Sequence, residues 1–258
     1  MKSIAFFALS LVATAAMATG SVNVAKINIT GTSDQTASVN GGYVKNTAQQ
    51  QSYANQNVAS NKGRIDIDGT SKQTATLENA HVTNTAQSAG DVAVQNLASN
   101  VGNVEVTKFF TLKGNSEQNV NVNNASVTNE ANSSSNNCSG PNCADAALAY
   151  QNLSSNMGEI NILGKSTQNS TVTGSSTVSN LAQGNNTVAV QNMSSNYGNI
   201  SISGTSTQTS SATAGAIIAN LAHGSHAHAY QNIASNDSCD PPPVVCVGPA
   251  CGPYALAH

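Results

Sequence analysis

Three short motifs recur in the same order five times along this 258-residue chain. The motif Gly-x-Ser-x-Gln ends at Gln35, Gln73, Gln118, Gln168 and Gln208. The motif (Val/Ile)-x-Asn-x-Ala is centred on Asn46, Asn84, Asn129, Asn180 and Asn220. The motif Gln-Asn-x-(Ala/Ser)-Ser-Asn begins at Gln56, Gln95, Gln151, Gln191 and Gln231. Self-similarity of this kind is typical of stacked repeat architectures, in which each unit contacts only its neighbours.

The repeats form one long domain between two dissimilar ends. The third motif begins at intervals of 39, 56, 40 and 40 residues, so the third repeat carries extra chain, mainly an insertion loop over about 132–146. We expect a five-repeat domain over 19–236, with repeats at about 25–63, 64–102, 103–158, 159–198 and 199–236. The segment 237–258 is rich in Cys and Pro and departs from the repeat, as a terminal cap would.

Each repeat alternates with a period of two residues. In the second repeat, Ile65, Ile67, Gly69, Ser71 and Gln73 occupy every second position, and the residues between them are polar and variable. This alternation predicts β-strands whose recurring face points inward. The parity changes by one residue at the Gln-Asn pair, so that Asn192, Ser194 and Asn196 share a face, which indicates a corner there. We predict one coil of four short strands per repeat, with two coils of two strands as the alternative.

The inward face contains amides, and the repeat itself can satisfy them. An unpaired buried amide costs about 1–3 kcal/mol. When equivalent strands stack about 4.8 Å apart, each amide can donate to one neighbour and accept from the other, as in a cross-β ladder. The sequence therefore predicts an all-β fold, a β-solenoid with Gln and Asn ladders. The fifteen numbered Gln and Asn positions of the three motifs are the predicted ladder and self-assembly residues.

The composition agrees with this architecture and excludes several others. Charged residues are 8% of the chain and aromatic residues 4%, with no Trp, whereas about a quarter of the residues in globular proteins are charged. The formal net charge of -3 provides no field that would recruit nucleic acid. Pro141 lies in the insertion loop and the other five prolines in the tail, so none falls in the repeated motifs, which fits paired strands because proline cannot donate to a ladder.

The first eighteen residues, 1–18, resemble a secretory signal peptide. Lys2 precedes an apolar run from Ile4 to about Val12, and Ala16-Met17-Ala18 fits the small-x-small cleavage pattern. The run is shorter than the ~20 apolar residues of a membrane span. We expect a mature chain that begins near Thr19, is secreted to the extracellular space or cell surface, and has no membrane span.

Two clusters of reactive side chains have competing interpretations. In an exported protein the sequence CSGPNC favours a disulfide between Cys138 and Cys143, while the pairing of the three tail cysteines stays open. His223, His226 and His228 are close in sequence and could bind Zn²⁺ or Cu²⁺ weakly or respond to pH. The alternative, which we favour, is an unconstrained polar loop, because the other repeats have no His there.

No catalytic constellation is present in the sequence. The carboxylates are scattered, and Ser and Thr are abundant without a placed base, a phosphate-binding loop or a zinc motif. We therefore predict neither an enzyme nor a cofactor or metal site.

Two segments resemble the repeats of curli and other secreted bacterial amyloid subunits. AQGNNTVAVQN, from Ala182 to Asn192, is similar to the curli-type strand–turn–strand unit, and NTAQSAGDVAVQN, from Asn84 to Asn96, is a looser version. The resemblance implies an extracellular fibre subunit of biofilms or surface attachment whose main partner is itself, with a nucleating or anchoring protein as a further partner. The unit here is near 40 residues, longer than the curli type, and the Cys/Pro tail is an additional departure.

Two functions follow as expectations. The first is a secreted structural subunit that self-assembles into an amyloid-like fibre or matrix, because uncapped end coils would offer unpaired strand edges. The alternative is a monomeric solenoid adhesin or binding module. An enzyme on a β-helix scaffold ranks third, since it would need an acidic cluster that the sequence lacks.

Overall fold

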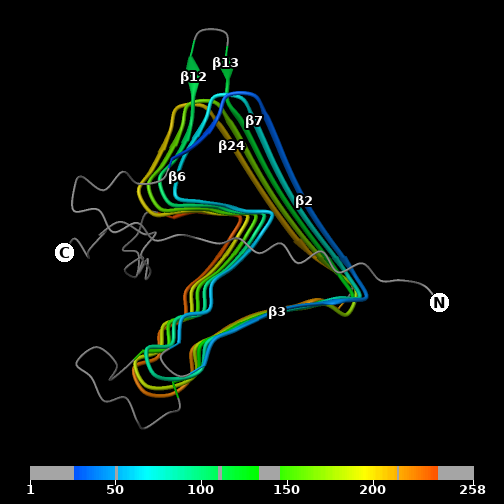
Figure 1. Ribbon diagram of the computed structural model, residues 1–258, viewed down its shortest axis with the longest axis vertical. Helices are drawn as coiled ribbons and strands as arrows, with labels where there is room; N and C mark the ends of the chain where they lie inside the picture. Colours follow the sequence, from blue (N-terminus) through cyan, green and yellow to red (C-terminus); the bar gives the residue numbers. More distant parts are fainter. Residues whose placement is uncertain (1–25, 50–51, 110–111, 134–145, 214, 238–258) are drawn as a thin grey trace.

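The computed structural model describes residues 26–49, 52–109, 112–133, 146–213 and 215–237, and in this part of the chain the five repeats form five stacked coils of a parallel β-solenoid (Figure 1). The first coil contains β1 (Lys26–Ile29), β2 (Thr32–Asn40), β3 (Tyr43–Thr47), β4 (Gln56–Val58) and β5 (Asn61–Lys62). The predicted all-β solenoid is confirmed. Residues 1–18 and most of the tail lie outside the described residues.

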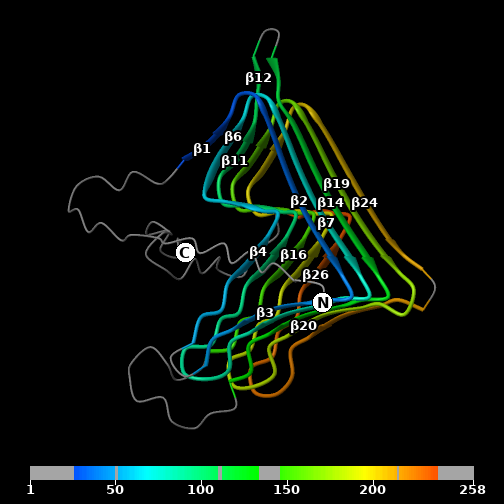
Figure 2. The same cartoon turned by 45° about the vertical axis from the view of Figure 1, so that its right-hand side comes forward.

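The later coils repeat this order of strands (Figure 2). The second coil has β6 (Arg64–Ile67), β7 (Thr70–Glu78), β8 (His81–Thr85), β9 (Gln95–Leu97) and β10 (Asn100–Val101). The third has β11 (Val104–Val106), β14 (Asn115–Asn123), β15 (Ser126–Glu130), β16 (Gln151–Leu153) and β17 (Asn156–Met157). The fourth has β18 (Ile160–Ile162), β19 (Lys165–Thr173), β20 (Thr177–Leu181), β21 (Gln191–Met193) and β22 (Asn196–Tyr197). The fifth has β23 (Ile200–Ile202), β24 (Thr205–Ala212), β25 (Ile217–Leu221), β26 (Gln231–Ile233) and β27 (Asn236–Asp237).

Each strand pairs in parallel with its counterpart in the next coil, which gives five sheets of five strands. The register places like over like; for example, Gln73 lies beside Gln118, and Gln118 beside Gln168. The expectation of four strands per coil, or of two smaller coils, was wrong, because each repeat closes one coil of five strands. The missed element is the two-residue strand that follows the corner, which is too short to produce an alternating pattern.

The predicted corner is present, and a single residue forms it in every coil. The fourth residue of the Gln-Asn motif has a positive φ of 47–51° at Ala59, Ala98, Ser154, Ser194 and Ala234. The left-handed conformation differs from that of the flanking strands, so the chain bends sharply at this small Ala or Ser. The parity changes at this residue, two positions later than the sequence suggested. Asn192 therefore faces the outside of the corner, whereas Asn196 faces the interior.

The corner points into the coil and reaches the opposite sheet (Figure 1). The Ser154 hydroxyl donates to the backbone oxygen of Asn169 at 2.7 Å, and the Ser194 hydroxyl donates to that of Thr209 at 2.7 Å. Because β19 and β24 belong to the long β2-type sheet, these contacts divide the interior into two compartments.

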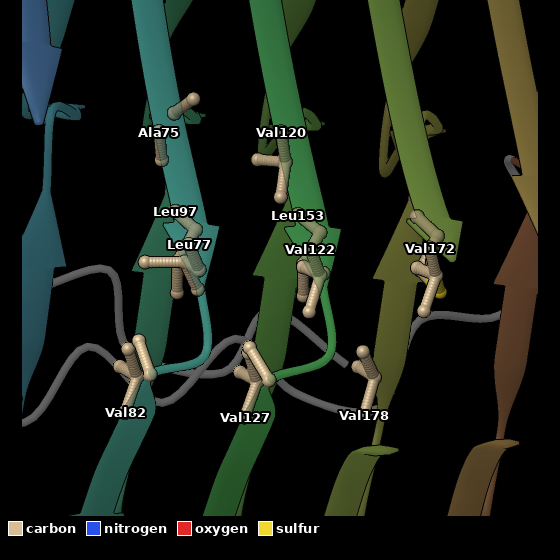
Figure 3. Close-up of a cluster of buried hydrophobic side chains, with 14 residues drawn as sticks. Ala75, Leu77, Val82, Leu97, Val120, Val122, Val127, Leu153, Val172 and Val178 are labelled. Atoms are coloured by element: carbon tan, nitrogen blue, oxygen red, sulfur yellow. The ribbon is translucent and has the colours of Figure 1, made fainter. Parts of the chain in front are cut away.

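Apolar side chains fill these compartments in columns that run along the stack. One compartment holds Leu and Val columns such as Leu77–Val122–Val172 and Val82–Val127–Val178 (Figure 3). The sheet that contains β1, β6, β11, β18 and β23 contributes two further columns of Ile and Val. A third cluster consists of alanines alone. Repetition thus replaces a core of large side chains.

Extra chain in the third repeat leaves the stack without changing its register. β12 (Lys108–Phe109) and β13 (Leu112–Lys113) form an antiparallel hairpin that projects from the corner between β11 and β14 (Figure 1). The flanking strands keep the pairing of the other coils. The second insertion, predicted at about 132–146, falls mostly on residues 134–145, outside the described part.

The glycine of the Gly-x-Ser-x-Gln motif permits a close approach of successive coils. A Cβ added at Gly164 would lie 2.3 Å from the backbone oxygen of Gly114, and one at Gly204 would lie 2.1 Å from that of Gly164. The equivalent Gly31 in the first coil has no atom within 4 Å of the added Cβ. The constraint on this glycine therefore comes from stacking, not from the local turn.

We predict that Gly164→Ala lowers the free energy of unfolding by about 2–4 kcal/mol, because backbone must shift to accept the methyl group. Gly31→Ala is the matched control at the same motif position, and it should change stability by less than about 0.5 kcal/mol. The measurement is the midpoint of urea unfolding for each variant. Equal losses in the two variants would contradict a stacking constraint.

Candidate functional site: the amide rows

The asparagine row of the second motif is a continuous ladder. Each Nδ2 donates to the Oδ1 of the next coil at 2.8–2.9 Å, from Asn46 through Asn84, Asn129 and Asn180 to Asn220. The same amide groups donate to backbone oxygens of the facing segment, as from Asn84 to Ala93 at 3.0 Å. The three inner members are fully buried. The predicted ladder forms at these five positions.

A second asparagine row, at the end of the Gln-Asn motif, was not among the predicted positions. Each Nδ2 again donates to the next Oδ1, at 2.8–3.0 Å. The row consists of Asn61, Asn100, Asn156, Asn196 and Asn236. Each Nδ2 before the last also donates to the motif serine of the next coil, as from Asn156 to Ser166 at 3.2 Å. The fixed place of this Asn in every repeat was the available signal.

The glutamines of the first motif bond to this second row instead of to one another. Gln73 donates to Asn100 at 2.7 Å, Gln118 to Asn156 at 2.6 Å and Gln168 to Asn196 at 2.6 Å. Gln35 and Gln208 make the same bond with Asn61 and Asn236. The five glutamines are in register as expected, and the three inner ones are fully buried, but their partners lie on a different strand of the coil. From Asn100 onward, each Asn oxygen of this row therefore accepts two bonds, one along the stack and one across it.

The glutamines of the third motif form an interrupted row. Gln95 donates to Gln56 at 3.0 Å and Gln231 to Gln191 at 3.3 Å. Gln151, in the middle of the stack, has neither its Nε2 nor its Oε1 paired. The predicted ladder is thus present at both ends of this row and absent at its centre.

A third asparagine row runs along the outside of the corner. Its members are Asn57, Asn96, Asn152, Asn192 and Asn232. Here each Nδ2 donates to the preceding coil, at 2.8–3.0 Å. This direction is opposite to that of the other two asparagine rows. Each end of the stack therefore presents amide donors in some rows and amide acceptors in others.

The other candidate sites show no assembled chemistry. Cys138 and Cys143 lie outside the described residues, as do the tail cysteines. His223, His226 and His228 are exposed in the fifth coil, and no group of three potential metal ligands occurs among the described residues. The same part of the chain contains no helix long and apolar enough to cross a membrane.

One carboxylate is buried at a position that the sequence did not single out. Asp91, between β8 and β9, is fully buried, and its Oδ2 accepts a bond from the backbone N–H of Ser88 at 2.8 Å. Burial raises the pKa of this carboxyl, against the lowering effect of that hydrogen bond. No sequence pattern marks Asp91, because the other repeats have different residues in this loop.

The sequence matches no protein-family model, no curated protein and no solved structure. The class of the molecule therefore rests on its geometry: a parallel β-solenoid whose interior polar groups are satisfied by stacked carboxamides.

We predict that Asn156→Ala lowers the free energy of unfolding by about 3 kcal/mol or more. Asn156 accepts from Asn100 and Gln118 and donates to Ser166 and Asn196, and its loss leaves buried donors unpaired at about 1–3 kcal/mol each. Asn161→Ala, on the half-buried outer face of β18, is the control and should cost less than about 1 kcal/mol. Chemical unfolding of the two variants measures the difference, and equal losses would contradict the role of the Asn156 row.

Asp91 gives a pH-dependent prediction. Its pKa is higher in the folded chain than in the unfolded chain, so the folded state binds the proton more tightly and stability falls as pH rises from about the ordinary value of 3.8 through the raised pKa. Asp91→Asn should reduce this fall and stabilise the protein at neutral pH. The measurement is the unfolding midpoint between pH 3 and 8, and an unchanged pH profile would contradict it.

Proposed function

We propose that the chain is a secreted structural subunit that self-assembles into an extracellular amyloid-like fibre or attachment matrix. The observation that carries this proposal is that the two end coils expose several side chains whose counterparts in the inner coils are buried. Apart from residues 108–113, whose side chains are not described, the large apolar side chains that are exposed in the described part of the chain all belong to the first or fifth coil. They are Tyr43, Ile202, Ile217, Leu221, Tyr230 and Ile233.

The polar rows are exposed at the same place. Asn100, Asn156 and Asn196 are fully buried, whereas Asn236, their counterpart in the fifth coil, is exposed. Gln208 is only half-buried, although Gln73, Gln118 and Gln168 are fully buried. A row that buries its inner members and exposes its last one is completed only by a further coil.

The end strands also present unpaired backbone groups. Each five-stranded sheet ends at a strand of the first coil and a strand of the fifth. Natural proteins block such edges with charge, proline or covering elements. β24, the eight-residue strand Thr205–Ala212, has no charged residue and no proline, so it has none of these defences within its own sequence.

A second copy of the chain fits these ends better than any other partner, since only a copy repeats all the rows. The resemblance of the repeats to curli-type units, and the signal-peptide pattern of residues 1–18, support export and an extracellular role in biofilm or attachment. A nucleating or anchoring protein would begin growth from a surface.

We predict that the purified chain, from Thr19 onward, assembles with a concentration-dependent lag into fibres that bind thioflavin. The fibres should give a reflection near ~4.7 Å along their axis, because the coils stack at strand spacing. Sedimentation and fibre diffraction are the measurements. A chain that stays monomeric at high concentration and binds a surface would favour the adhesin instead.

A further inference from the structure

We infer that the ends join head to tail in a single register, in which Asp237 of one molecule pairs with Lys62 of the next. The partner of the fifth coil is thus the first coil of a second copy. This inference rests on the proposed self-assembly and specifies its geometry: the polarity of the joint, its register and the charge pair that selects them.

The register is a direct extension of the pairing inside the molecule. In the sheet formed by β5, β10, β17, β22 and β27, one column contains Lys62, Val101, Met157, Tyr197 and Asp237. If a sixth coil followed in the same register, it would place Lys62 of the next molecule beside Asp237. The column thus has opposite charges at its two ends and uncharged residues between them.

The surroundings of this column make the charges important. Val101, Met157 and Tyr197 are 7%, 5% and 3% exposed, and they belong to an apolar cluster in the outside angle of the corner. A charge brought into this cluster by stacking loses much of its water, so it needs an opposite charge beside it. Lys62, whose Nζ lies 3.4 Å from the Tyr53 hydroxyl, and Asp237 provide opposite charges for one another across a head-to-tail joint.

The other charged residues of the first coil form no charge pair across the joint. Lys26 already pairs with Asp66 of the second coil. In the same extension of the register, Asp34 lies beside Thr207 and Lys45 beside Ala219. Neither position brings two charges together. The β5 column is therefore the place where the joint has charge complementarity.

The amide rows impose the same polarity. Inside the molecule the rows of Asn46 and Asn61 donate toward the fifth coil, so Asn220 and Asn236 have amide protons to offer to Asn46 and Asn61 of the next molecule. The row of Asn57 donates in the other direction, so Asn57 offers its amide proton to the oxygen of Asn232. Donors meet acceptors in all three rows.

Joining two identical ends would lose these matches. One molecule must be turned over to bring the first coil against another first coil, and this reverses the strand direction relative to its neighbour. The parallel pairing of every sheet and the superposition of the rows are then lost together. Head-to-tail addition preserves both.

Two charge reversals test the joint. Lys62→Asp places two carboxylates together at each joint, and Asp237→Lys places two ammonium groups together. Like charges held together are costly. For each variant alone, the monomer concentration that remains at equilibrium should therefore be about tenfold or more above that of the wild type. An equimolar mixture should assemble like the wild type. When the two variants alternate along the fibre, every joint pairs a carboxylate with an ammonium group. A misfolded variant would not be rescued by mixing.

The matched control is Lys45→Asp, which makes the same change in net charge on the first coil but faces Ala219 across the joint. It should assemble within about twofold of the wild type. The readout is the monomer concentration remaining after sedimentation, together with the circular dichroism of the monomers. The proposed joint is overturned if the single variants assemble normally, if mixing does not restore assembly, or if Lys45→Asp has the same effect. A wild-type chain that never assembles overturns the proposed function as well.

Discussion

The structure depends on a hydrogen bond that a carboxamide makes with a copy of itself one strand spacing away. A carboxamide carries a donor and an acceptor, so equivalent amides in successive coils satisfy one another. Asn156 shows how far this extends, since it bonds to both neighbouring coils and to a glutamine and a serine of the long sheet. A polar interior of this kind exists only while the repeats stay in register, because every partner belongs to another repeat or another strand of the coil.

Close approach is the second condition, and it explains the bias toward small residues. Gly164 leaves no room for a methyl group above Gly114, and the left-handed corner is occupied by Ala or Ser. Amide bonding and steric fit therefore select the same register, which is the consistency expected of a sequence that specifies one fold.

Much of the fold was predictable because its signals are local. Alternation identified the strands and their inward face, and the recurrence of three motifs identified the stack. The number of strands was not predictable, because strands of two residues such as Asn61–Lys62 show no alternation. The bonding of Gln73 to Asn100 was not predictable either, since it depends on the inward corner that brings two strands of one coil together. The change of parity was placed two residues early, so Asn192 was assigned to the wrong face.

The projecting hairpin of β12 and β13 shows that a corner can absorb additional chain while the strands on both sides remain paired as before. One such protrusion occurs in the five coils described. In a filament of stacked molecules it would recur once per subunit, at roughly 24 Å for five coils at strand spacing. The filament would then carry a regular series of lateral attachment points, and its periodicity would be set by the number of repeats in the gene product.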